Sequence, residues 1–180
     1  MKAKKILPWS SILLLMSVGS AEAATFDVNV AVGPGSVIGQ IVTDGVLGPA
    51  NVLDWNLIAN DGSSSVNLLG PLSGANSTYG GDVPLSETAS QLLFDFSAPA
   101  FHFNRFCLGS LITCPNGWAY VSFGAGTGGH RVATGQLLIE TGGLSGQGII
   151  GQLAPVPLPA TLWMLAPALG GLGFLRRRPA

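Results

Sequence analysis

Two histidines, His102 and His130, are the side chains best suited to act as bases at neutral pH. His102 alternates with aromatic residues in Phe101-His-Phe-Asn104, which is typical of an ordinary strand histidine. Ser122 or Ser145, with His130 and an aspartate, would supply a nucleophile and its base. The chain lacks a Gly-x-Ser-x-Gly sequence in the strand-to-helix context that exposes such a serine. We therefore expect no catalytic residues and a protein that is not an enzyme.

Metal and phosphate binding have weak signals in this chain. Oxygen ligands for calcium are available in Asn60-Asp61-Gly62-Ser63 and Asp82, but no loop has the alternating acids of a dedicated calcium site. The glycine-rich segment Gly124 to Gly129 lacks the Lys-Ser/Thr ending and the following helix of a phosphate-binding loop, so a hairpin turn explains it better. We predict no metal and no cofactor, with calcium binding as the open alternative.

Aromatic side chains offer a different chemistry, because their rings can stack on sugar rings. The candidates are Trp55, Trp118, Tyr79 and Tyr120. Trp55 alternates with Leu53 and Leu57, which favours a place in the core. Tyr79 lies in the polar segment Ser-Thr-Tyr-Gly-Gly-Asp and is the candidate that we expect to be exposed for glycan contact.

The segment from Ala24 to Pro155 is strongly acidic. It contains eight acidic residues and only two basic ones, Arg105 and Arg131, which gives a formal charge of −6. The other six basic residues lie near the two ends of the chain. This charge argues against nucleic acid or anionic lipid as a partner. Sparse charges with abundant Gly, Ser, Thr and Asn are typical of an exported β protein.

Apolar residues repeat with a period of two in the middle of the chain, and turn signals separate the runs. The clearest runs are residues 26–32, 53–57, 92–96, 118–123 and 135–140. Such runs predict strands with one buried and one wet face. Seven or eight short strands predict an all-β fold, an antiparallel β-sandwich or jelly-roll-like single domain, with an open barrel as a further alternative. One or two helical turns are expected in Pro84 to Leu92, with Ser86 as N-cap.

The first 23 residues have the order of a signal peptide. Lys2, Lys4 and Lys5 precede the apolar stretch Ile6 to Val18, and Ala21-Glu22-Ala23 is a small-residue cleavage site. The mature chain should therefore begin at Ala24 after export by the Sec machinery. An uncleaved membrane anchor is the alternative, although the apolar run is short for one.

Cys107 and Cys114 are the only cysteines. In an exported chain an even number of cysteines favours a disulfide. A zinc site would need more ligands than the nearby His102, and a redox pair more often has two residues between its cysteines. We predict a structural Cys107–Cys114 disulfide that contributes about 2–3 kcal/mol.

The last 25 residues consist of three parts. The prolines of Val156-Pro157-Leu158-Pro159-Ala160 favour extended backbone over helix. The following apolar run, Thr161 to Leu175, carries no charge, and Arg176-Arg177-Arg178 would hold this end on the cytoplasmic side. As a helix the run is short for a bilayer and includes Pro167, so a temporarily held transmembrane segment is the favoured interpretation. A plain membrane anchor is the alternative.

This tail resembles the PEP-CTERM sorting signal of Gram-negative bacteria in its VPLPA variant, with Leu158 where the name-giving motif has Glu. The resemblance covers about one seventh of the chain. It implies recognition by a membrane-embedded exosortase, which cleaves near the Pro-x-Pro motif, and a bacterium that makes exopolysaccharide. The segment Ile41 to Leu57, with its Thr-Asp-Gly turn and Asp-Trp-Asn-Leu run, also resembles the opening of many secreted PEP-CTERM proteins, without implying an activity.

The expected organisation has four segments. These are a signal peptide (1–23), a β domain (24–142), a Gly-rich linker (143–155) and a sorting signal (156–180) with its motif at 156–160, apolar helix at 161–175 and arginine cluster at 176–178. We expect a noncatalytic protein with a structural or adhesive role, held transiently at the inner membrane as a precursor and then sorted to the cell surface or exopolysaccharide matrix. The alternatives are a carbohydrate-binding module and a secreted hydrolase.

Overall fold

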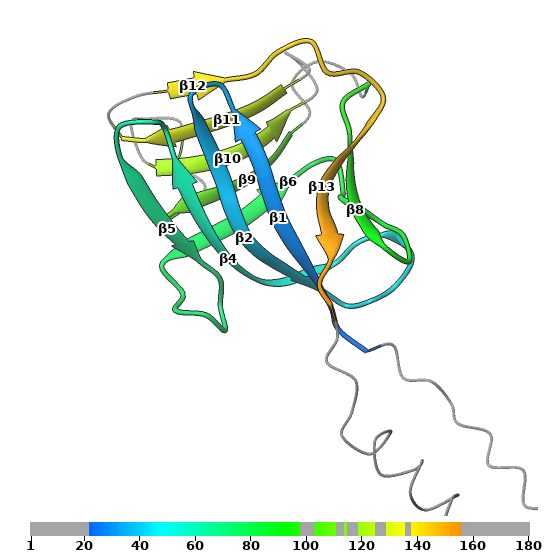
Figure 1. Ribbon diagram of the computed structural model, residues 1–180. Helices are drawn as coiled ribbons and strands as arrows, with labels where there is room; N and C mark the ends of the chain where they lie inside the picture. Colours follow the sequence, from blue (N-terminus) through cyan, green and yellow to red (C-terminus); the bar gives the residue numbers. More distant parts are fainter. Residues whose placement is uncertain are drawn as a thin grey trace, which may run out of the picture.

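A computed structural model describes residues 22–97, 103–110, 114, 119–124, 129–135 and 138–155. These residues form antiparallel strands in two sheets and contain no helix (Figure 1). The larger sheet has the spatial order β3 (Gly48–Pro49), β7 (Ser86–Glu87), β8 (Gln91–Asp95), β13 (Gln147–Leu153), β1 (Ala24–Val32), β2 (Gly35–Thr43), β4 (Val52–Asn60) and β5 (Ser65–Leu69). The smaller sheet has the order β12 (Leu138–Glu140), β11 (Gly129–Thr134), β10 (Ala119–Gly124), β9 (Phe103–Leu108) and β6 (Ser77–Gly81). The prediction of an all-β fold is confirmed.

The alternation of buried and exposed side chains along β1 shows why these residues form strands. Phe26 and Val32 are fully buried, whereas Asp27 and Asn29 between them are exposed. Successive side chains of a strand point to opposite faces, so one face of β1 joins the core and the other faces water. The same pattern places Leu92, Phe94 and Phe96 of the β8 region in the core, as the sequence predicts.

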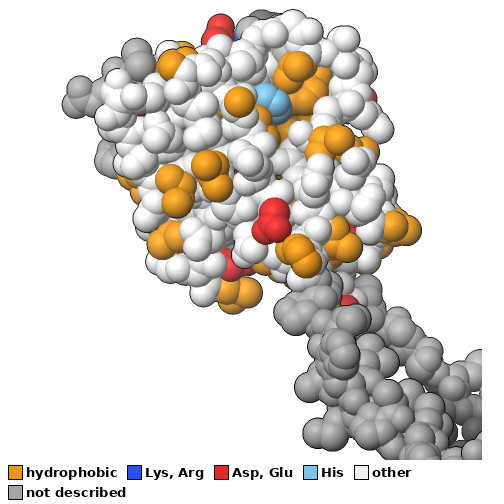
Figure 2. All heavy atoms as spheres, viewed as in Figure 1, with side chains coloured by type: hydrophobic (Ala, Val, Ile, Leu, Met, Phe, Trp, Pro, Cys, Tyr) orange, Lys and Arg blue, Asp and Glu red, His pale blue; other side chains and the backbone are white. Residues whose placement is uncertain are grey.

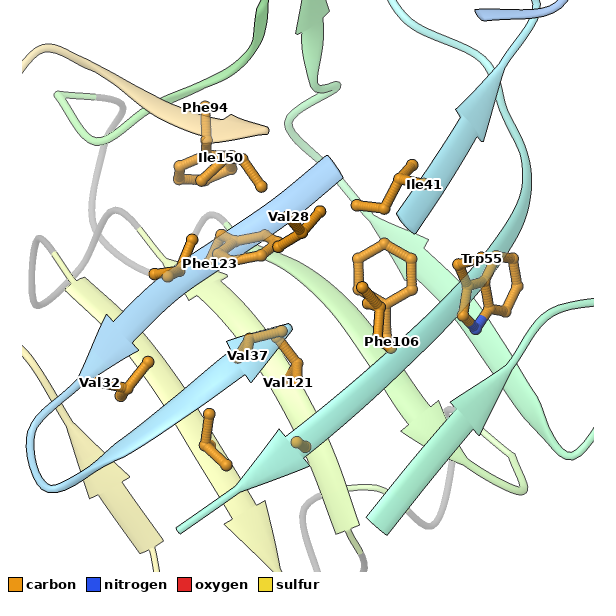
Figure 3. Packing of buried hydrophobic residues seen from close by; sticks show 14 of the residues in the cluster. Val28, Val32, Val37, Ile41, Trp55, Phe94, Phe106, Val121, Phe123 and Ile150 are labelled. Carbon is orange, nitrogen blue, oxygen red and sulfur yellow. The ribbon is translucent and has the colours of Figure 1, made fainter. Parts of the chain in front are cut away.

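The two sheets pack face to face over one apolar core (Figure 3). Aromatic rings connect them: Trp55 of β4 lies 5.3 Å from Phe106 of β9, and Phe94 of β8 lies 6.4 Å from Phe123 of β10, measured between ring centroids. The Trp55 indole N–H donates to the Ser77 hydroxyl at 2.8 Å, which satisfies a polar group that would otherwise be buried without a partner. Trp55 is therefore a core residue, as its sequence pattern predicts.

An irregularity in β4 departs from the simple alternation. The pairing of β2 with β4 shifts so that Val42 faces Asp54 and Thr43 faces Val52. The extra residue, Leu53, is 39% exposed, and Asp54 is buried. The expected alignment of Leu53 with Trp55 toward the core is therefore wrong, because a β-bulge reverses the direction of the side chains that precede it.

The segment Pro84 to Leu92 contains strands β7 and β8 rather than the expected helical turns. Leu85 is fully buried, and the buried Glu87 carboxylate accepts a hydrogen bond of 2.5 Å from the Thr43 hydroxyl. This contact to another strand fixes an extended conformation, so the tertiary partner outweighs the N-cap signal of Ser86.

The expected linker 143–155 is also wrong, because most of it is strand β13 inside the larger sheet. This strand pairs with β1 on one side and with β8 on the other. Ile150 is 1% exposed and belongs to the core. Glycines at 148 and 151 mask the strand pattern in the sequence; each is packed closely, Gly148 against Phe96 and Gly151 against Phe26. The β domain therefore extends to about residue 155.

The start of β1 and the end of β13 lie side by side at one end of the domain (Figure 1). Phe26 is the register partner of Leu153, and the Ala154 N–H donates to the Thr25 carbonyl at 2.8 Å. Residues 1–21, with Ala21 of the predicted cleavage site, and the whole predicted sorting signal 156–180 lie outside the described residues. Within the described residues no helix is long and apolar enough to cross a membrane.

Candidate binding face on the smaller sheet

Both arginines of the acidic domain lie on the same face of the smaller sheet. Ser122 of β10 pairs with Arg105 of β9 on one side and with Arg131 of β11 on the other. The neighbours of these residues along each strand, such as Phe106, Phe123 and Val132, are buried in the core. The side chains of Arg105, Ser122 and Arg131 consequently point to the opposite side of the sheet, where the two arginines are partly exposed and Ser122 is buried. We call this row, together with Phe103 and Tyr120, the arginine face.

Aromatic rings pack around the Arg105 guanidinium. Its central carbon lies 4.2 Å from the centroid of the Phe103 ring and 5.1 Å from that of Tyr120. Both distances fit cation–π contacts. Burial lowers the pKa of Arg105 below its usual value; Tyr120 acts in the opposite direction, and the positive charge of Arg131 lowers the pKa further. Arg105 still carries its charge at neutral pH, in a partly apolar setting.

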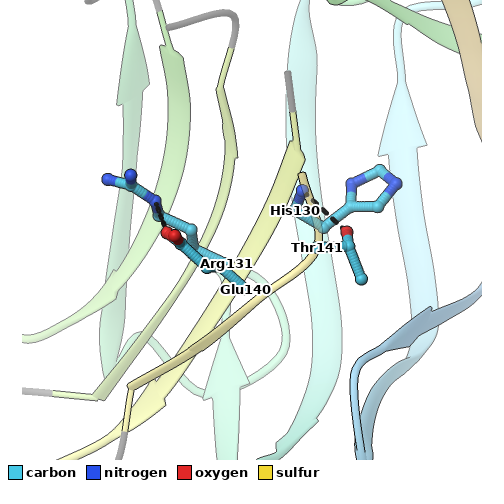
Figure 4. Close-up of polar contacts among 4 residues, drawn as sticks. All are labelled: His130, Arg131, Glu140 and Thr141. Carbon is cyan, nitrogen blue, oxygen red and sulfur yellow. Dashed lines mark hydrogen bonds and ion pairs between the residues drawn. The ribbon is translucent and has the colours of Figure 1, made fainter. Parts of the chain in front are cut away.

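Arg131 forms an ion pair with a neighbouring strand. Its Nε lies 2.7 Å from the Glu140 carboxylate of β12, and the two side chains are 34% and 47% exposed. Figure 4 shows the terminal nitrogens of Arg131 pointing away from Glu140. One edge of this guanidinium is thus engaged by Glu140, and the other edge is directed outward.

The predicted disulfide is present and adjoins the arginine face. Cys107 and Cys114 are bonded, with their Cα atoms 5.7 Å apart, and both are fully buried. Cys107 lies two residues after Arg105 on β9 and is the register partner of Tyr120. The bond therefore fixes the chain after β9 beside the Tyr120 position.

Tyr79 does not have the exposed position that its sequence context predicts. Its ring lies 4.7 Å from that of Phe106 and 6.0 Å from that of Trp55, on the core side of β6. Burial raises the pKa of its phenol to about 12. The expectation of exposure fails because Tyr79 shares the inward face of its strand with Ser77, which the Trp55 indole requires as its partner. Glycan contact by Tyr79 stays a prediction.

The residues considered for nucleophilic chemistry fall on opposite faces of the smaller sheet. His130 pairs with Phe123 and points inward, whereas Ser122 points outward. The His130 ring lies in edge contact with the rings of Phe96 and Phe123, at 5.1 and 5.4 Å. Burial lowers its pKa to about 4, and the Nδ1 atom is buried without a hydrogen-bond partner. His102 lies outside the described residues.

The carboxylate of Asp61, considered above as a calcium ligand, is already occupied by hydrogen-bond donors. It accepts from the hydroxyl of Thr134, from the N–H groups of Ser63 and Ser64, and from the Ser64 hydroxyl. These bonds hold its pKa at about 2, with the Thr134 hydroxyl as the largest contribution. They also connect the end of β4 with the end of β11, so Asp61 links the two sheets. In the described part of the chain, no three His, Cys, Asp or Glu residues gather as a metal site.

The outer face of the larger sheet has a different chemistry. Figure 2 views the domain from this side and shows few charged side chains, with hydrophobic side chains lying separately among backbone and uncharged groups. Asp27 and Gln40, joined by a hydrogen bond of 2.9 Å, lie beside Gln152 on adjacent strands. A hollow of about 490 Å³ is lined by Asp27, Asn29, Gln152 and their neighbours. This face offers amide groups without aromatic rings.

Comparisons with known proteins give no relative: no family model, no curated protein and no solved structure matches this chain. The candidate site is therefore defined by its geometry alone. Sequence reasoning identified Tyr120 as one of four aromatic candidates but missed its association with the two arginines. A signal was present, because Arg105 and Arg131 are the only basic residues between Ala24 and Pro155. Their pairing across Ser122 depends on strand register, which the sequence does not reveal.

Proposed function

We propose that this chain is a noncatalytic exported protein whose β domain acts structurally or adhesively at the cell surface or in an exopolysaccharide matrix. In this proposal residues 1–23 are a signal peptide and 156–180 a PEP-CTERM-like sorting signal read by an exosortase. The precursor is held at the inner membrane until the tail is processed. We also assign the two-sheet domain to the sandwich class rather than the jelly rolls, because β9 to β12 form a simple meander.

The observation that carries this proposal is the position of the two ends of the folded domain. Thr25 and Ala154 are hydrogen-bonded neighbours, so both targeting segments attach at the same end of the domain. The strands β1 and β13 are complete without either segment. The core residues that the structure describes all lie between Ala24 and Ile150, so removal of both segments would leave their contacts with one another in place. The buried disulfide agrees with an oxidising destination.

The test separates recognition of the tail from membrane insertion. Replacing Pro157 and Pro159 together by Ala leaves the apolar run 161–175 and the arginines unchanged, so insertion should persist. Helix can then extend into the motif and remove the extended backbone that a protease grips. We expect an uncleaved, membrane-held precursor, detected by mass spectrometry of both termini in membrane, surface and medium fractions.

The matched control removes the positive charges at the C-terminal end and leaves the extended proline motif unchanged. Deleting Arg176, Arg177 and Arg178 should loosen retention and orientation without protecting the motif from cleavage. A host without the exosortase should accumulate the same precursor as the double-proline variant. If that variant is cleaved and released like the natural protein, the plain membrane anchor is the better explanation.

A carbohydrate-binding role is the second candidate, and the arginine face favours it. Tyr120 and Phe103 place aromatic rings on an outer sheet face, where a sugar ring can reach them. Tyr79 is the weaker contact because its ring packs on Phe106. A glycan array probed with the exported protein tests this role: the Tyr120→Ala variant should lose signals that a Tyr79→Phe variant retains. Equal signals from both variants would exclude the arginine face as the contact surface.

A further inference from the structure

The arginine face concentrates all the basic charge of an acidic domain in one place. Arg105 and Arg131 flank Ser122 on three consecutive strands, so their Cα atoms are about 10 Å apart. Within the described residues, the salt bridge at this face joins Arg131 to Glu140. Two carboxylates lie beside this row: Glu140 pairs with Arg131, and Asp82 at the border of the face accepts a hydrogen bond from the Phe103 N–H. The edge of Arg131 that points away from Glu140 is where an anionic ligand could add a second ion pair.

The carboxylates elsewhere in the domain have their own hydrogen-bond partners. Asp54 accepts from the Leu72 N–H and the Ser73 hydroxyl, and Asp61 accepts from Thr134 and the Ser63–Ser64 turn. Glu87 accepts from Thr43 in the core. These groups stabilise loops and strand contacts at other positions, so they do not neutralise the arginine face.

The arrangement of side chains on the arginine face sets a second requirement for a ligand, in addition to a negative charge. The Arg105 guanidinium is stacked against Phe103 and Tyr120, so a charged group and apolar ring surfaces lie together. The outward edge of Arg131 offers two parallel N–H donors, which match the two oxygens of a carboxylate. A ligand that uses all of these groups has a carboxylate attached to a ring with an apolar face.

We propose that the arginine face binds carboxylate-bearing saccharides, that is, chains containing uronic acid residues. The carboxylate of one sugar accepts hydrogen bonds from the Arg131 guanidinium, and the ring of a neighbouring sugar packs on Tyr120 beside Arg105. Nucleic acid fits less well, because a domain with a formal charge of −6 repels a dense phosphate backbone. This inference rests on the proposed carbohydrate-binding role and names its ligand class.

The experiment measures binding of the protein, purified after export of the full chain, to polygalacturonate at low ionic strength. Fully methyl-esterified polygalacturonate is the matched ligand, because it keeps the backbone and masks each carboxylate. We expect binding to polygalacturonate only, weakened by added salt. Arg131→Gln should reduce affinity about tenfold or more, since it removes charge-assisted hydrogen bonds to the carboxylate. Arg105→Gln should also reduce affinity, because it removes a positive charge beside the bound sugar.

The control variant Asn29→Asp changes the net charge by the same amount on the outer face of the larger sheet, and its affinity should equal that of the natural protein. Tyr120→Ala should weaken binding while Tyr120→Phe keeps most of it. If Arg105→Gln lowers the melting temperature, Arg131→Lys replaces it as the test variant. Lysine keeps the positive charge but lacks the two parallel N–H donors, so we expect a clear loss of affinity.

Three results would overturn the inference. The first is binding to the methyl ester with the same affinity as to polygalacturonate, and the second is no binding to polygalacturonate. The third is binding to dextran sulfate or single-stranded DNA that is as tight as binding to polygalacturonate and is weakened equally by the arginine variants. Binding to neutral glycans alone would leave the carbohydrate-binding role intact and refute only this ligand class. The export proposal is judged separately by the termini of the mature protein.

Discussion

His130 is a titratable side chain enclosed by aromatic rings, and it makes the stability of the domain depend on pH. Its ring touches Phe96 and Phe123 and points away from Arg131 and Glu140 (Figure 4). Burial lowers its pKa to about 4 from an ordinary value of 6.5. The unfolded chain therefore takes up a proton between these values while the folded domain does not. The contribution of His130 to stability is therefore complete above pH 6.5 and is lost as the pH falls toward 4.

We expect this residue to account for about 3 kcal/mol of the difference in unfolding free energy between pH 7 and pH 4. Urea titrations at several pH values measure it. In the variant His130→Phe, which keeps an aromatic ring in the cluster, the decline between pH 6.5 and 4 should largely disappear. A slope in this variant equal to that of the natural protein would assign the effect to other groups.

Asp61 and Thr134 provide a second residue-scale test, because the two are 73 positions apart and link the sheets. The Thr134 hydroxyl is the main reason that the pKa of Asp61 lies at about 2. Replacing Thr134 by Val should raise this pKa toward 3.8, as measured by NMR titration of the carboxyl group. Ser97→Ala is the control: it removes the hydroxyl that lowers the pKa of Asp95 and should leave Asp61 unchanged.

At the scale of elements, β13 is the strand whose role most needs a direct test. Ile150 is 1% exposed and its neighbour Ile149 is 48% exposed. Ile150→Ala should lower the unfolding free energy by about 2–5 kcal/mol, because it leaves a cavity between the sheets. Ile149→Ala should change it by about 0.5 kcal/mol or less. Denaturant unfolding of the two variants separates a core strand from a linker, in which both substitutions would be equally mild.

The sequence predicts strands well where a period of two is uninterrupted, as in β1 from Ala24 to Val32. It fails where the decisive information lies in a partner strand. Gly148 and Gly151 give β13 the composition of a linker, although both lie inside the strand, Gly148 against the Phe96 ring and Gly151 close to Phe26. The bulge at Leu53 has no local signal, because it results from the pairing of β2 with β4.

The candidate site likewise depends on partner strands that the local sequence does not reveal. The disulfide can be predicted from two cysteines in a chain whose first 23 residues have the order of a signal peptide, whereas the arginine face cannot be predicted. Arg105 and Arg131 are 26 positions apart, and only the hairpin register of β10 and β11 brings Arg131 beside Ser122. Tyr79 shows the converse error: a polar local sequence suggested exposure, but strand direction turned its ring inward toward Phe106.

For the whole molecule, the first strand fixes where the mature chain can begin. Ala24 is the first residue of β1 and pairs with Thr43. The proposed cleavage after Ala23 would remove residues 1–23 without shortening this strand, and we expect N-terminal sequencing of protein recovered outside the cell to start at Ala24. A mature chain that begins within residues 25–32 would lose part of β1 and would contradict both the cleavage site and the integrity of the larger sheet.

The pairing of β1 with β13 also determines how the domain responds to mechanical force. The N-terminal and C-terminal ends of the domain lie on the same side. A pull between them would therefore break the β1–β13 hydrogen bonds one after another, starting at that side. A pull on the C-terminal end alone would instead act on β13 where it pairs with both β1 and β8. If residues 1–23 are removed as proposed and the chain stays held through its C-terminal end, the load falls on both strand pairs of β13 rather than on one.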